Sequence, residues 1–180
     1  VSAYNTLPSR GVYVSPLLVT KIEDSDGNVL ANFTSRKREA ISDQTAYLMV
    51  NLMQGVVNEG TAIRLKYKYG LEGELAGKTG TTNDHSDGWF IGYTPKLTAG
   101  IWVGGEDRQV HFDNMSLGQG ANMALPIWGM FMQKVYNDPT ISIGKNDHFV
   151  APPGWKMVLN CTGDDSDLQH LESTQSESVE

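Results

Sequence analysis

Gly77-Lys78-Thr79-Gly80-Thr81-Thr82-Asn83-Asp84, followed after two residues by Asp87-Gly88-Trp89-Phe90-Ile91-Gly92-Tyr93-Thr94-Pro95, is the stretch that decides the fold of this chain. Strand-forming residues on either side of a short polar turn predict two strands, over 75–82 and 88–93. A third strand is expected over 97–104. Because the connections are short, antiparallel pairing is the default, and the stretch predicts one antiparallel sheet.

Two helices are expected around this sheet. The first begins after Ser42, a plausible N-cap, and runs to about Asn58, with apolar residues recurring at spacings of three and four. Gly60 is expected to end it through a left-handed C-terminal cap. The second helix is predicted over 121–136 and contains Pro126 in its first turns.

The residues before the first long helix predict a hairpin. Strands over 17–23 and 29–33 flank Asp24-Ser25-Asp26-Gly27-Asn28, which is typical of a turn. A calcium loop is the alternative, but its glycine and its final glutamate would be misplaced. Residues 1–7 are expected to be the last turns of a helix that begins in a longer chain, and Arg36-Lys37-Arg38 a solvated loop.

Composition limits the function. With 180 residues and 39% hydrophobic content, the chain suits one globular domain, and no apolar run reaches membrane-spanning length. Of the formal net charge of -7, six negative charges arise in residues 164–180, which hold six acidic and no basic residues. We therefore expect a folded domain over 1–160 and an acidic, disordered tail over 161–180. The near-neutral remainder lacks the basic face of a nucleic-acid-binding protein, and the single Cys161 excludes an internal disulfide.

The Lys-Thr-Gly triplet suits acyl transfer on a peptide. Lys78 supplies a positive charge, and the hydroxyls of Thr79 and Thr81 suit a substrate carboxylate. Gly80 lacks a side chain, so an extended peptide can lie along the strand edge. A backbone N–H just past Gly80 can stabilise an oxyanion, a contribution of about 3 kcal/mol.

Other chemistries fit the residues less well. Gly77-Lys78-Thr79 also ends the phosphate-binding pattern Gly-x-x-x-x-Gly-Lys-Thr, but Glu72 stands where that pattern needs glycine, and no helix is expected after the threonine. The polar run over 83–87 is ordinarily a turn rather than a metal site. We expect neither a metal nor a cofactor.

The chain resembles the transpeptidase domain of class A, bifunctional penicillin-binding proteins. Lys78-Thr79-Gly80 matches the third motif of the penicillin-recognising serine enzymes. Flanking stretches that share the resemblance are Arg10-Gly11-Val12-Tyr13-Val14-Ser15-Pro16, Gly55-Val56-Val57 with Glu59-Gly60-Thr61-Ala62, and Ala124-Leu125-Pro126-Ile127-Trp128. The resemblance implies an α+β fold, an antiparallel sheet flanked by helices as in the penicillin-binding and serine β-lactamase enzymes, with only its C-terminal portion present.

The resemblance also implies site residues and partners. Lys78 and Thr81 would be catalytic, with the Thr81 N–H as an oxyanion donor, and Thr79, Gly80 and Thr82 would bind substrate. The parent would cross-link D-Ala-D-Ala stem peptides through a serine acyl-enzyme, bind β-lactams, carry a glycosyltransferase domain, and be membrane-anchored outside the cytoplasm.

The motifs that should supply the nucleophile do not occur in the expected order. No Ser-x-Asn is present, and the only Ser-x-x-Lys, Ser142-Ile143-Gly144-Lys145, follows the Lys-Thr-Gly strand instead of preceding it. We therefore expect the isolated chain to lack the nucleophile. The alternative hypothesis is a catalytically inert module that self-associates through exposed apolar surface.

Overall fold

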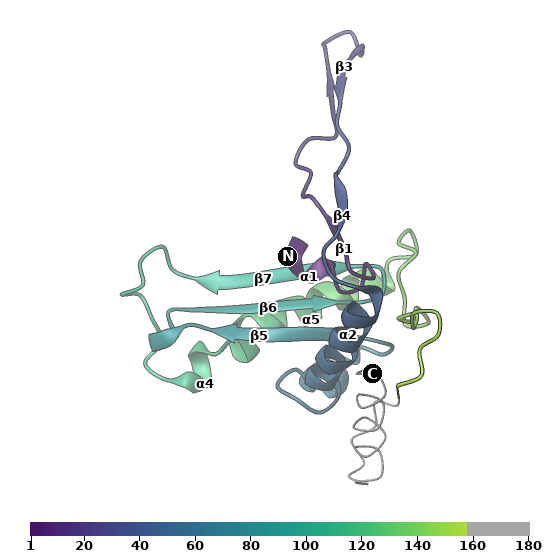
Figure 1. Cartoon of the computed structure of the whole chain (residues 1–180). Coiled ribbons are helices and arrows are strands. Elements are labelled where there is room, and N and C mark those ends of the chain that lie inside the picture. Colours follow the sequence, from purple (N-terminus) through teal and green to yellow (C-terminus); the bar gives the residue numbers. More distant parts are fainter. Residues whose placement is uncertain (158–180) are drawn as a thin grey trace, which may run out of the picture.

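A three-stranded antiparallel sheet forms the centre of the computed structural model, which describes residues 1–157 (Figure 1). Its strands are β5 (Ala76–Thr81), β6 (Asp87–Tyr93) and β7 (Thr98–Gly104), in the spatial order β5-β6-β7. Thr79 pairs with Phe90, and Phe90 with Ile101. The predicted strands and their antiparallel pairing are confirmed, and β5 is an edge strand.

Helix α5 (Gly120–Asn137) covers one face of the sheet. Trp128 of α5 is fully buried, stacks edge-on against Phe90 with ring centroids 5.3 Å apart, and donates its indole N–H to the carbonyl of Ala99. The helix lies close because β6 has glycine at position 92, where a Cβ would come within 2.6 Å of the Trp128 ring. A small residue in the sheet therefore admits the helix at this point.

Helix α2 (Asp43–Asn58) packs on the opposite face, where Val50 contacts Ala76 and Tyr93. Its predicted N-cap is confirmed, since the Ser42 hydroxyl accepts a hydrogen bond from the Thr45 N–H at 3.1 Å. The predicted cap at the other end is wrong. Gly60 does not adopt a positive φ, and it is needed because a Cβ there would lie 2.8 Å from the Val56 Cα.

A narrow arm projects from this body (Figure 1). Its base pairs β1 (Val12–Val14) with β4 (Lys37–Glu39), and its outer part pairs β2 (Lys21–Glu23) with β3 (Val29–Asn32). The predicted hairpin is confirmed, with shorter strands. The predicted solvated loop at Arg36-Lys37-Arg38 is corrected: Lys37 and Arg38 belong to β4, with exposed side chains, because the backbone pairs with β1.

The remaining elements are short: α1 (Ser2–Asn5), α3 (Arg64–Tyr67), the 3-10 turn η1 (Asn83–His85) and α4 (Met115–Gly118). Helix α1 agrees with the helical end expected over residues 1–7. Within residues 1–157, no helix has the length and apolar character needed to span a membrane. The acidic tail predicted over 161–180 lies outside the described residues.

Candidate functional site

The Lys-Thr-Gly triplet lies in β5, whose outer side pairs with no strand among residues 1–157. Alternation along the strand directs Lys78 to the same face as its partner Ile91, which is the face that α2 partly covers. Thr79 and Thr81 point to the α5 face. The lysine and the two threonines therefore lie on opposite faces of the sheet, and all three border the free edge of β5.

The Lys78 ammonium is exposed, and its Nζ donates a hydrogen bond to the carbonyl of Thr79 at 2.9 Å. Within the described chain, no carboxylate forms an ion pair with it. A lysine that contacts only a backbone carbonyl keeps donors available for another anionic or polar group. The positive charge thus remains unneutralised at the strand edge.

Contacts from distant segments hold the two threonines. The Thr79 and Thr61 hydroxyls lie 3.2 Å apart, and Thr61 follows the end of α2. The Thr81 hydroxyl accepts a hydrogen bond from the Gly120 N–H at 3.0 Å, at the start of α5. This acceptance leaves the Thr81 hydroxyl proton free to donate to a ligand.

Close packing explains why α5 begins with glycine. A Cβ on Gly120 would lie 2.3 Å from the Gly80 carbonyl oxygen and 2.5 Å from that of Trp89. Only a residue without a side chain lets the first turn of α5 approach β5 closely enough to bond Thr81. The sequence analysis singled out neither Thr61 nor Gly120 as a contact of the site, and the glycine at position 120 was a local sign of the second contact only.

The turn after β5 is strained. Asp84 and His85 both adopt the left-handed conformation, with φ of 58° and 56°, which is uncommon for residues other than glycine. The Thr82 hydroxyl closes the turn, because it lies 3.0 Å from the Ser86 hydroxyl and accepts from the Asp87 N–H at 3.0 Å. Thr82, predicted to bind substrate, thus has a structural contact within the turn.

A polar cavity of about 450 Å³ opens beside this turn. It begins at the carboxyl end of β5 and extends to the loop between β7 and α4. Its lining residues are Thr81, Thr82, Asn83, Asp84, Ser86 and Arg108. Two predicted site residues, Thr81 and Thr82, therefore line it, whereas Arg108 was not singled out by the sequence.

The Ser-x-x-Lys stretch is engaged elsewhere. Lys145 forms an ion pair with Glu72 at 2.6 Å, and the Ser142 carbonyl accepts from Lys96 at 3.4 Å. The hydrogen bond and the charge of Glu72 raise the pKa of Lys145. Among residues 1–157, neither Ser142 nor Lys145 makes a hydrogen bond to β5.

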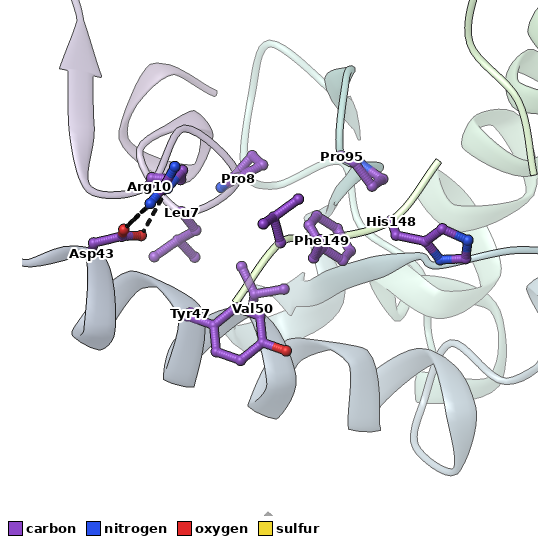
Figure 2. Close-up of a pocket in the computed structure, with 10 residues that line it drawn as sticks. Leu7, Pro8, Arg10, Asp43, Tyr47, Val50, Pro95, His148 and Phe149 are labelled. Carbon is purple, nitrogen blue, oxygen red and sulfur yellow. Dashed lines mark hydrogen bonds and ion pairs between the residues drawn. The ribbon is translucent and has the colours of Figure 1, made fainter. Parts of the chain in front are cut away.

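A second, smaller cavity of about 110 Å³ lies between the N-terminal turn, α2 and the C-terminal segment (Figure 2). The Arg10 guanidinium bonds both carboxylate oxygens of Asp43 at its rim, and this contact raises the pKa of Arg10. The lining is Leu7, Pro8, Arg10, Asp43, Tyr47, Val50, Pro95, His148, Phe149 and Val150. None of the predicted site residues belongs to it, so we assign it no part in the chemistry.

Comparisons with known proteins agree on one family. Residues 1–126 match the penicillin binding protein transpeptidase domain. The chain is 34% identical to penicillin-binding protein 1A of Aquifex aeolicus over 159 residues, which are 88% of this chain and 20% of that protein. It is 37% identical to penicillin-binding protein 1F of Bacillus subtilis over 108 residues, 57% of this chain and 15% of that protein. The chain thus spans a fifth or less of these curated relatives.

Solved structures give the same fold. Penicillin-binding protein 1A from Haemophilus influenzae superposes with a TM-score of 0.72 at 20% identity, over 84% of this chain and 27% of that one. PonA1 from Mycobacterium tuberculosis, in complex with penicillin V, gives a TM-score of 0.60 at 24% identity, over 84% and 43% of the two chains. The α+β arrangement, an antiparallel sheet flanked by helices, is that of these transpeptidase structures.

Proposed function

The chain belongs to the penicillin-binding protein transpeptidase family, and from that premise we propose that β5 forms one side of a D,D-transpeptidase active site. The reaction is the cross-linking of peptidoglycan stem peptides that end in D-Ala-D-Ala, through a serine acyl-enzyme that β-lactams also form. The observation that carries the proposal is the open edge of β5, which an unneutralised lysine borders on one face and two oriented threonines border on the other.

Each residue of the strand has a role in this reaction. A stem peptide adds to the β5 edge as an extended strand, and Gly80 leaves room for its backbone. Thr79 and Thr81 donate hydroxyl protons to the terminal carboxylate, and Lys78 balances its charge. The Thr81 N–H stabilises the oxyanion. Thr82 contributes indirectly, by closing the turn that follows Thr81.

The nucleophilic serine is assigned to a part of the longer protein outside these 180 residues. The relatives are about five times as long as the matched stretch, which leaves ample chain to carry it. We therefore propose that the isolated chain is inactive and that the whole protein also carries glycosyltransferase activity. By analogy with its relatives, that protein acts on the outer side of the membrane.

Lys78→Ala in the full-length protein tests the assignment. We expect acylation by benzylpenicillin to be lost, because the positive charge beside the reacting centre is removed, while the melting temperature stays unchanged, because Lys78 is exposed. Lys21→Ala, in the arm, is the matched control and should be acylated as the unmodified protein is. A Lys78→Ala protein that is acylated at the unmodified rate would overturn the role of Lys78.

The alternative of an inert interaction module is not favoured by the comparisons. Self-association of the isolated chain remains a separate proposal. It rests on apolar side chains that the arm and the sheet expose: Leu18, Leu30, Trp89 and Trp102. Sedimentation velocity at rising concentration should show dimers or larger species, and a strictly monomeric chain at high concentration would contradict it.

A further inference from the structure

The ribbon that forms the outer part of the arm has one regular edge and one interrupted edge. Strand β2 pairs with β3 and, within residues 1–157, with no other strand. Ile22 of β2 lies opposite Ala31 of β3. The next residue, Glu23, lies opposite Val29, so β3 carries one residue more than β2 and forms a bulge there. Because a bulge discourages further pairing along its own strand, the free edge of β2 is the one that suits another strand.

The backbone groups of Lys21 and Glu23 point away from β3. On the β3 side, the Thr20 carbonyl accepts a hydrogen bond from the Phe33 N–H at 2.9 Å. The Asp24 N–H donates to a carbonyl at the tip of the ribbon at 3.0 Å. Alternate residues of an antiparallel strand direct their N–H and carbonyl groups toward the same neighbour. Lys21 and Glu23, which alternate with these residues, therefore hold their N–H and carbonyl groups on the free edge of β2.

The charges on this edge are complementary to those of a second copy in one antiparallel register. Two β2 strands that pair about Ile22 place Lys21 of each copy opposite Glu23 of the other. Opposite charges in such positions stabilise a strand pair, and like charges destabilise it. A register centred on Lys21 or on Glu23 would instead bring that residue opposite its own copy. The charged side chains therefore favour pairing about Ile22 over the neighbouring registers.

The shape of the molecule allows two arms to meet in this way. The arm projects from the body, and β2 runs from the base of the arm toward its tip (Figure 1). Antiparallel arms overlap along their length and hold the two bodies at opposite ends, so the bodies do not collide. An isolated two-stranded ribbon is marginally stable in water, whereas a sheet of three or more strands can be stable. Pairing through β2 joins two such ribbons into one wider sheet.

We propose that the free edge of β2 is a homodimer interface, at which the arms of two copies form one antiparallel sheet centred on Ile22. Lys21 and Glu23 of opposite copies exchange both backbone hydrogen bonds and form an ion pair. The two Ile22 side chains contact each other across the twofold axis. The inference rests on the proposed self-association and gives it a defined surface. Because the edge is short, the dimer is weak and its population rises with protein concentration.

Disulfide cross-linking tests the register. Cys161→Ser removes the only thiol of the chain, and Ile22→Cys then places one thiol of each copy at the centre of the interface. The Cα atoms of a non-hydrogen-bonded pair lie about 4.5 Å apart, within the range of a disulfide. We expect covalent dimers after mild oxidation, measured on a non-reducing gel. Ala31→Cys is the matched control and should stay monomeric, because three strand spacings, about 14 Å, separate its two copies.

Charge reversal tests the ion pairs. Lys21→Glu should raise the Kd of the dimer about tenfold, because both pairs of opposite charges become pairs of like charges. Sedimentation equilibrium of the chain measures this Kd. Lys21→Glu combined with Glu23→Lys exchanges the signs, restores both pairs and should recover the unmodified Kd. Lys37→Glu, at the base of the arm, is the matched control and should leave the Kd unchanged.

Two results would overturn the interface. One is equal cross-linking of Ile22→Cys and Ala31→Cys, and the other is a doubly reversed variant that associates no better than Lys21→Glu alone. If the unmodified chain still associates in either case, its self-association uses another surface and only this inference fails. A chain that is monomeric at every concentration would overturn the self-association and the interface together. Acylation of the full-length protein by benzylpenicillin tests the transpeptidase function independently of both.

Discussion

The body and the arm use the same kinds of apolar residue, but they bury them very differently. In the body, Phe90, Leu125 and Trp128 are fully buried between the sheet and α5. In the arm, Leu18 is 98% exposed and Leu30 is 66% exposed. An isolated two-stranded ribbon contributes little stability in water. The comparison indicates that the body is stabilised by burial of its own apolar side chains. The apolar side chains of the arm are not buried by any segment of residues 1–157.

The pairing in the arm explains its composition. Ile22 lies opposite Ala31 on one face, and Lys21 lies opposite Asn32 on the other. Lys21 and Glu23 form an ion pair at 2.6 Å, and the register shifts between Ile22 and Glu23, so that Glu23 lies opposite Val29. The ribbon therefore mixes apolar with charged side chains, and every residue of β2 is exposed. Its sequence alone does not distinguish it from a strand of the body.

Trp128→Ala is expected to have the largest effect. The substitution removes the ring that packs on Phe90 and should lower the free energy of unfolding by about 3–5 kcal/mol. Urea denaturation of the chain, followed by circular dichroism, measures this loss. Trp102→Ala is the matched control, because Trp102 is 46% exposed. If Trp102→Ala lowered the free energy of unfolding as much as Trp128→Ala does, burial would not explain the contribution of Trp128.

Gly92→Ala tests the close approach of α5 to the sheet. A Cβ would meet the Trp128 ring at 2.6 Å, so we expect a loss of about 1–3 kcal/mol from overpacking. Gly55→Ala in α2 is the control. Nothing lies within 4 Å of its new methyl group, and alanine should stabilise the helix by about 0.5–1 kcal/mol. If both variants shifted the denaturation midpoint in the same direction, the close packing of α5 on the sheet at Gly92 would be contradicted.

Tyr93 makes the stability of the body depend on pH in the alkaline range. Burial raises the pKa of its phenol above the ordinary value of about 10, so the folded state keeps the proton longer than the unfolded state does. This contribution is complete below pH 10 and is lost as the pH rises toward the raised pKa. Tyr93→Phe should flatten the fall in stability above pH 10, measured as melting temperature against pH. An unchanged slope would be evidence against a buried, protonated phenol.

Ile22→Ser in the arm is expected to have the smallest effect. The side chain is 45% exposed, and the residue pairs with Ala31 in the hairpin, so the free energy of unfolding should change by no more than about 0.5 kcal/mol. The measurement is the same urea titration. A loss comparable with that of Gly92→Ala would show that the arm and the body unfold as one unit.

The sequence predicted the parts of the fold that depend on local patterns. Strand-forming residues and short turns identified β5, β6 and β7, and helical periodicity identified α2. Strands β1 and β4 were missed. The basic residues of β4 are typical of a loop, and only the structure shows that Lys37 pairs with Val14. The cap at Gly60 was predicted wrongly, because a contact with the preceding turn, and not φ, requires that glycine.

The same distinction holds for the site. The Lys-Thr-Gly strand was recognised from contiguous residues. Thr61 and Gly120 were missed because they bond residues 18 and 39 positions away, and only the fold brings them together. Arg108 was missed for the same reason, since its loop reaches the turn after β5 through packing that no local pattern encodes.

The open edge of β5 has a consequence for solubility. An unpaired strand edge offers its N–H and carbonyl groups to any other extended chain and is therefore a site where aggregation can begin. Natural sheets discourage such pairing by placing charged residues, especially lysine, on exposed edges. Lys78 occupies that position here, in the middle of β5. Its charge therefore protects the sheet against pairing with a second copy, and neutral substitutions at position 78 should lower solubility.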